Sequence, residues 1–91
     1  MTYNAALVSL SFADFWVRAS ASLNDEGGEC AVAKLMCATN ANVAKLGVVA
    51  AEMAASLSRR AVALLRLEDN EIINGVFRAM AMNKACESFI C

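Results

Sequence analysis

Histidine and proline are both absent from this 91-residue sequence, which contains only four glycines. Without histidine, the chain lacks the commonest general base and the commonest metal ligand of proteins. The Ser and Cys side chains have no base at a recognisable spacing, and the adjacent Gly27 and Gly28 lie in an acidic tract that would repel phosphate. We therefore predict no catalytic, cofactor or metal site. An enzyme would need a second chain to supply the missing groups.

The lack of proline, together with abundant alanine, leucine and methionine, favours helix almost everywhere. We predict an all-α fold in which residues 1–91 form a single helical assembly domain. The first helix should run from about Thr2 to Leu23 and end at the polar, glycine-containing segment 24–29. A long second helix should begin near Cys30, with a kink or short break near residues 66–72. The result is a helical hairpin whose last segment extends from Glu71 to about Phe89.

Charged residues make up only 19% of the chain, and the net charge is −1. The basic residues are scattered, which argues against binding to nucleic acid. The longest uncharged stretch runs from Met1 to Ala13, whereas a membrane-spanning helix needs about 18 to 20 apolar residues. We therefore predict no transmembrane segment. No basic region precedes the apolar N-terminal stretch, so we expect no secretory signal and a cytoplasmic location.

Hydrophobic residues make up 59% of the chain, against about 45–50% in typical soluble domains. Between residues 32 and 62 they form two stripes with alternating spacings of three and four residues. The first stripe contains Val32, Met36, Thr39, Val43, Leu46, Ala50, Met53 and Leu57. The second contains Ala41, Ala44, Val48, Ala51, Ala55, Ser58 and Val62. On one continuous helix these stripes would lie roughly opposite each other, which predicts neighbours on two sides and therefore self-association.

Three aromatic residues, Phe12, Phe15 and Trp16, cluster on the first predicted helix. Their spacing is helical and no polar group converges on them, so a cofactor site is not indicated. We expect this patch to close the hairpin or to form a lateral contact between subunits.

The four cysteines, Cys30, Cys37, Cys86 and Cys91, include no CxxC pair, so a metal site is not expected. Cys30 and Cys37 would lie about 10 Å apart along a helix, too far for a bond between them. We interpret the cysteines as packing residues. The alternative is intermolecular disulfides in an oxidising medium, with Cys91 as the best candidate.

An acidic cluster, Glu68, Asp69 and Glu71, lies at the predicted break, where Asn70 or its acidic neighbours could cap a new helix. Like charges in this cluster repel each other, so acidification would discharge them and change the packing of neighbouring chains. The cluster is therefore a candidate pH sensor, with solvated helix ends as the alternative.

The segment from Thr39 onward, TNANVAKLGVVAAEMAASL, resembles the central pattern of the R-body structural proteins, the Reb or killing-trait family. The positions that carry the resemblance are Thr39, Asn40, Val43, Leu46, Gly47, Ala50, Ala51, Met53 and Leu57, followed by Leu65, Leu67, Ile72 and Ile73. The chain departs from that family in lacking a Gln-rich tract after this region and an Ala-Pro step. The resemblance implies a small helical subunit of a coiled intracellular ribbon that extends on acidification, in bacteria that live in or on eukaryotic hosts.

Two functional hypotheses follow. The first is a non-enzymatic structural subunit that polymerises through the two stripes, with copies of itself and related helical subunits as partners and no small-molecule substrate. The second is a helical-hairpin chaperone or adaptor of a bacterial secretion system.

Overall fold

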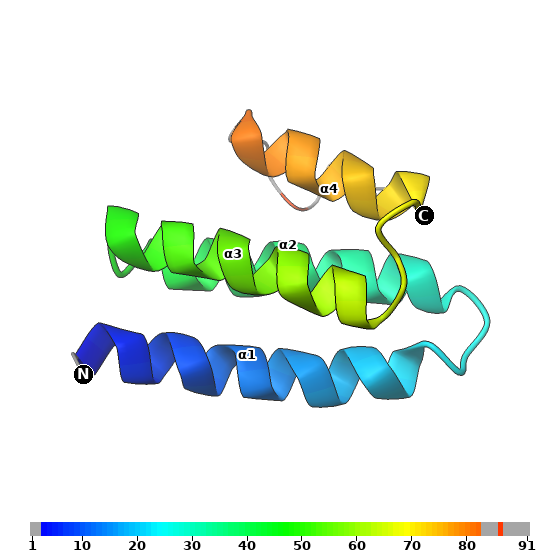
Figure 1. Cartoon of the computed structure of the whole chain (residues 1–91), viewed down its shortest axis with the longest axis horizontal. Helices are drawn as coiled ribbons and strands as arrows, with labels where there is room; N and C mark the ends of the chain where they lie inside the picture. The colour runs from blue at the N-terminus through cyan, green and yellow to red at the C-terminus, as the bar shows by residue number, and fades with distance from the viewer. Residues whose placement is uncertain (1–2, 83–85, 87–91) are drawn as a thin grey trace.

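The structure, a computed structural model, describes residues 3–82 and 86, with side chains described from residue 6 onward. This part of the chain contains α1 (Tyr3–Ser22), α2 (Gly28–Ala44), α3 (Val48–Leu64) and α4 (Glu71–Ala81). The all-α prediction is therefore confirmed. In Figure 1, α2 and α3 form a central hairpin, with α1 along one side of it and α4 along the other.

The turn between α1 and α2 depends on two adjacent glycines. Gly27 has a φ of 73°, in the left-handed region that glycine adopts most readily. Gly28 is buried, and a Cβ at this position would collide with the carbonyl oxygen of Ser22. The two glycines let the chain reverse tightly enough for α2 to pack against α1. The predicted loop and the predicted extent of the first helix are both confirmed.

The long helix expected from Cys30 onward is in fact two helices, divided at residues 45–47. Gly47 has a φ of 120° and a ψ of 177°, a backbone conformation that is essentially restricted to glycine. The chain folds back at this residue, and α3 packs against α2. The physical reason for the break is that folding back buries apolar side chains of both helices inside one subunit, which a continuous rod would leave exposed.

The predicted break near residues 66–72 is confirmed. Local hydrogen bonds end α3 on one side of it and begin α4 on the other. At the end of α3, Arg66 has a φ of 59°. The Leu67 N–H donates to the Val62 carbonyl at 2.9 Å, and the Arg66 N–H to the Ala63 carbonyl at 3.1 Å. These two bonds form a Schellman motif. At the start of α4, the Asn70 side chain accepts hydrogen bonds from the backbone N–H groups of Ile72 and Ile73, at 2.9 and 3.1 Å, as an N-cap does.

One hydrophobic core joins all four helices. Its largest fully buried side chains are Phe15, Met36, Ile73, Val8, Val32, Val43 and Val76. The helices on the two sides of the hairpin contact it differently. The helix α1 packs against both α2 and α3, whereas α4 packs against α2 without comparable contact with α3. This difference leaves a space between α3 and α4 over the surface of α2.

Candidate binding surfaces

The first predicted stripe lies inside the subunit. Val32, Met36, Val43 and Ala50 are buried, and the other members predicted to mediate assembly, Leu46, Met53 and Leu57, are partly buried against the same core. The stripe therefore faces other helices of its own chain, which corrects the expectation that it forms a surface between subunits. On α3 the buried face is shifted from this stripe, because Ala54, Ser58 and Ala61 are buried while Met53 and Leu57 are partly exposed.

Most of the second stripe lines a cavity of about 420 Å³ between α3 and α4. The alanine, phenylalanine and methionine side chains around this α3–α4 cavity come from three helices: Ala41, Ala44, Ala51, Ala55, Phe77, Met80 and Ala81. Val48, a member of the same stripe, is 77% exposed at the start of α3. The small side chains thus leave an open apolar space, where the sequence had predicted a face for tight packing against another chain.

Two polar side chains, Arg59 and Asn40, also line the α3–α4 cavity. The guanidinium carbon of Arg59 lies 5.7 Å from the centroid of the Phe77 ring, a cation–π contact that connects α3 to α4. The one ion pair within the described residues joins Asp14 to Arg18, at 3.2 Å on α1. Arg59 therefore brings a positive charge to the cavity that no described carboxylate neutralises.

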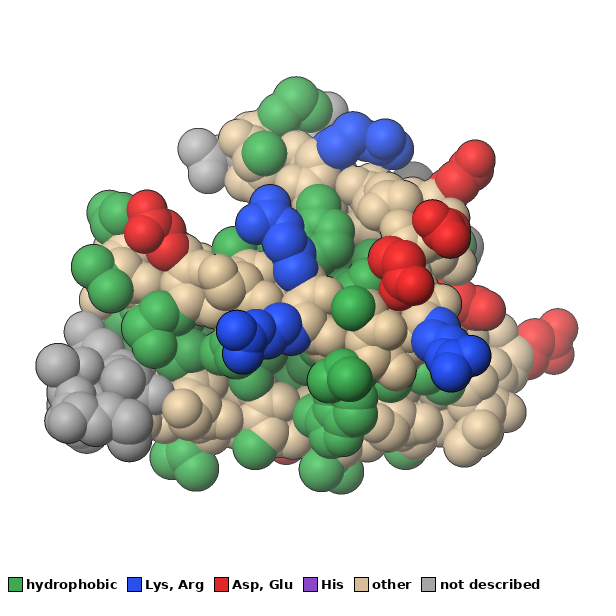
Figure 2. Space-filling model, in the orientation of Figure 1, with side chains coloured by type: hydrophobic (Ala, Val, Ile, Leu, Met, Phe, Trp, Pro, Cys, Tyr) green, Lys and Arg blue, Asp and Glu red, His purple; other side chains and the backbone are tan. Residues whose placement is uncertain are grey.

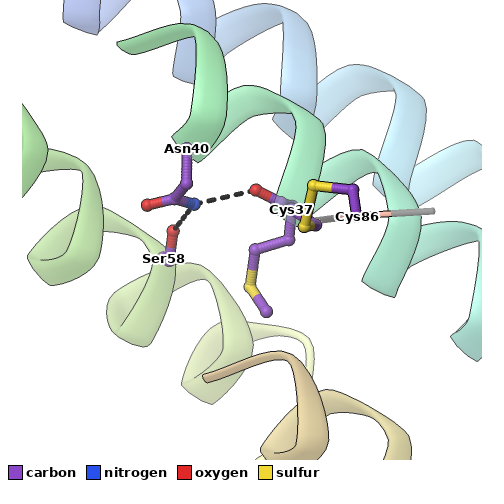
Figure 3. The surroundings of a disulfide bond; sticks show 5 residues. Cys37, Asn40, Ser58 and Cys86 are labelled. Atoms are coloured by element: carbon purple, nitrogen blue, oxygen red, sulfur yellow. Dashed lines mark hydrogen bonds between the residues drawn. A yellow bond between two sulfur atoms is a disulfide. The ribbon is translucent and has the colours of Figure 1, made fainter. Parts of the chain in front are cut away.

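Asn40 belongs to a buried polar contact between α2 and α3, shown in Figure 3. Its Nδ2 donates to the Met36 carbonyl and to the Ser58 Oγ, both at 2.8 Å. These two bonds use both hydrogens of the amide. The side-chain hydrogen bond fixes the register of α2 against α3 within a core that is otherwise apolar.

A disulfide joins Cys37 on α2 to Cys86, with 5.8 Å between the Cα atoms and a sequence separation of 49 residues (Figure 3). Cys30 is also disulfide-bonded. These residues are thus covalently paired, which corrects their interpretation as free packing residues. Cys91, the candidate for an intermolecular bond, lies outside the described residues. Cys37 and Cys86 both line the α3–α4 cavity, so the disulfide forms part of its wall.

The aromatic patch of α1 is divided between core and surface. Phe12 and Phe15 are buried with their ring centroids 5.7 Å apart in an edge-to-face arrangement, and Trp16 is 38% exposed. The hairpin-closing role is therefore filled by the two phenylalanines, which pack α1 onto α2 and α3.

The helix α1 has a second apolar face, which its generally apolar sequence does not distinguish from the first. Leu10 and Val17, both 68% exposed, lie on the side of α1 opposite its buried residues. With the exposed alanines between and beyond them, they form the outer α1 face: Leu10, Ala13, Val17 and Ala21. In Figure 2, charged side chains gather over α3, α4 and the turns, whereas the visible edge along α1 carries several separate hydrophobic side chains on a mostly uncharged surface. The spacing of three, four and four residues could have revealed this face.

The acidic cluster lies where it was predicted, around the turn that leads into α4. Glu68, Asp69 and Glu71 are all exposed. A role of this cluster in sensing pH stays a prediction.

No family model, curated protein or solved structure matches this chain. The resemblance to the R-body proteins therefore also stays a prediction. Within residues 3–82, no helix combines the length and the hydrophobicity needed to cross a membrane.

Proposed function

We propose that the protein is a non-enzymatic helical subunit that associates with copies of itself through the outer α1 face. The observation that carries this proposal is the apolar character of α1 on two opposite sides. One side, formed by Val8, Phe12, Phe15 and Ala19, is buried in the core, while the outer α1 face is exposed. Single exposed apolar residues are ordinary, but an aligned stripe along a 20-residue helix is the pattern of a helix with a partner on each side.

A second copy suits this face better than a partner of opposite charge. Asp14, beside the stripe, is paired with Arg18 on the same helix at 3.2 Å, so the surroundings of the stripe offer little net charge for recognition. Two identical apolar stripes are complementary to each other, and most soluble oligomers are symmetric assemblies of identical chains. The association proposed here therefore joins folded subunits through their surfaces.

This arrangement differs from the one expected from the sequence. A ribbon made of long two-faced rods would need the first stripe at the surface, but that stripe packs within the subunit. The self-association hypothesis is supported here by a different helix, α1, and the unit that associates is a compact four-helix subunit.

The disulfides favour an oxidising compartment over the predicted cytoplasmic location. The bonds of Cys37, Cys86 and Cys30 would be reduced by the thiol systems of an ordinary cytoplasm. We propose that the subunit works in a periplasmic, extracellular or comparable oxidising environment.

The test is sedimentation equilibrium of the oxidised chain and of the double variant Leu10→Glu, Val17→Glu. We expect the parent chain to form a dimer or larger assembly and the variant to weaken association more than about 100-fold, because it removes apolar burial and adds like charges. The matched control is Val48→Glu, Val49→Glu, which changes residues that are 77% and 72% exposed at the start of α3.

The control should associate like the parent chain. A parent chain that stays monomeric at high concentration would overturn the proposal, as would equal loss of association in both variants. A defined complex with a different protein, in place of self-association, would favour the adaptor hypothesis.

A further inference from the structure

We infer that the α3–α4 cavity binds an apolar small molecule with one anionic group, of the class of medium-chain fatty acids. This inference goes beyond the proposed self-association and does not depend on it, because the described residues of the cavity come from α2, α3, α4 and Cys86, and none from α1. It revises the expectation that the chain takes no small molecule.

The size and lining of the cavity favour an apolar ligand. Its volume of about 420 Å³ lies within the range of about 300–1,000 Å³ that is usual for small-molecule sites. Methyl groups of Ala41, Ala44, Ala51 and Ala55 line the side toward α2 and α3, and the larger Phe77 and Met80 side chains line the side toward α4. Alanines on two adjacent helices leave this space open, since larger side chains would fill it.

The charge at the cavity favours an anion at one end of the ligand. Arg59 is the one charged side chain among the described lining residues, and its described contact is with the Phe77 ring. A carboxylate is a stronger partner for a guanidinium than an aromatic ring is, because it forms charge-assisted and often bidentate hydrogen bonds. We place the carboxylate at Arg59 and the alkyl chain against the alanines.

The other polar lining group does not compete for the carboxylate. Both Nδ2 hydrogens of Asn40 are already donated, to the Met36 carbonyl and the Ser58 Oγ. The free capacity of the amide is its acceptor oxygen, which would repel a carboxylate. This leaves Arg59 as the described lining residue that would determine where the anionic group binds.

The experiment compares decanoate with decanol by isothermal titration calorimetry on the oxidised full chain. We expect decanoate to bind about tenfold more tightly than decanol, because only the acid gains a charge-assisted hydrogen bond. Arg59→Gln should lower the affinity for decanoate about tenfold and leave that for decanol within about twofold. The matched control, Arg60→Gln, changes an exposed neighbour outside the cavity lining and should leave both affinities unchanged.

The location of the ligand is tested by NMR of labelled alanine methyl groups, with decanoate added to the parent chain. The methyl resonances of Ala41, Ala44, Ala51 and Ala55 should shift, and those of Ala13 and Ala21 on the outer α1 face should not. Absence of decanoate binding, equal affinity for acid and alcohol, or shifts confined to α1 would each overturn the inference. Repeating the titration with the Leu10→Glu, Val17→Glu variant separates this result from self-association, because the cavity should bind decanoate in that variant as well.

Discussion

The helices α1 and α4 cover the central hairpin from opposite sides, and they are held in different ways. The 20-residue α1 lies against both α2 and α3, with Phe12 and Phe15 buried beneath it. The 11-residue α4 lies against α2, and Cys86 just beyond it is bonded to Cys37.

Broad apolar contact holds α1 to the hairpin, whereas α4 has a narrower contact and a covalent link beside it. Where a helix spans both members of the hairpin, side-chain burial is enough to hold it. Where it spans one member, a cavity remains beside it, and a disulfide together with a side-chain cap compensates for the narrower contact. The helix α4 should therefore depend on the disulfide and the cap more than α1 does.

Removing the disulfide should have the largest effect. For a separation of 49 residues, the loop-closure relation gives a loss of about 4 kcal/mol in the free energy of unfolding when Cys37 and Cys86 are both replaced by serine. Urea unfolding measures the total loss of unfolding free energy. Hydrogen exchange of the Ile73 and Val76 amides shows whether the loss is concentrated in α4. We expect these α4 amides to lose more protection than those of Phe12 and Phe15. Equal losses in α1 and α4 would contradict the comparison.

Asn40→Ala should have the next largest effect, and it should act on the hairpin itself. The change removes both hydrogen bonds of the Asn40 side chain and leaves the buried Ser58 hydroxyl without that partner. We expect a loss of about 2 kcal/mol in the free energy of unfolding. Adding Ser58→Ala to this variant should cost little more, since the two side chains act as a pair. Additive losses in thermal or urea unfolding would show that the bond between them contributes nothing.

Asn70→Ala should destabilise the protein by about 1 kcal/mol, the usual cost of losing an N-cap. The cap matters because α4 has 11 residues and a narrow contact with the hairpin. Asn42→Ala, an exposed change on α2, is the matched control and should alter the free energy of unfolding by less than about 0.5 kcal/mol. Indistinguishable urea midpoints for the two variants would mean that the cap does not stabilise α4.

The smallest expected effect is an increase in the free energy of unfolding. Arg66 occupies a left-handed conformation, with a φ of 59°, that glycine adopts without steric cost. Arg66→Gly should therefore raise the free energy of unfolding by about 0.5 kcal/mol. A fall in the thermal midpoint of this variant would show that the arginine side chain contributes more than its backbone strain costs.

Local features of the fold could be predicted from the sequence, whereas features that depend on distant contacts could not. The range of α1 and the break before α4 follow from composition, glycines and the Asn70 cap. The sequence does not mark Gly47 as a turn, because one glycine in an alanine-rich helix costs only about 1 kcal/mol. Burial between α2 and α3 decides that the chain turns there. The pairing of Cys37 with Cys86 across 49 residues has no local pattern that predicts it.

The candidate surfaces can be predicted only in part, because they too depend on contacts between residues distant in the sequence. On one continuous helix the two stripes of residues 32–62 would be opposite faces. The turn at Gly47 instead directs the first stripe inward and places alanines of the second around a cavity. The outer α1 face is visible in the spacing of Leu10 and Val17. The sequence does not distinguish it from the buried face, since both sides of that helix are apolar and only the packed structure shows which one is covered.

The central claim is that the outer α1 face joins copies of this chain. Isotope-filtered NMR on an assembled mixture of labelled and unlabelled chains tests it most directly, because it detects only contacts between different copies. Our account predicts intermolecular contacts that involve the Leu10 and Val17 methyl groups. Intermolecular contacts confined to Ala51, Ala55 and Val48, or an assembly in which α1 makes none, would contradict it.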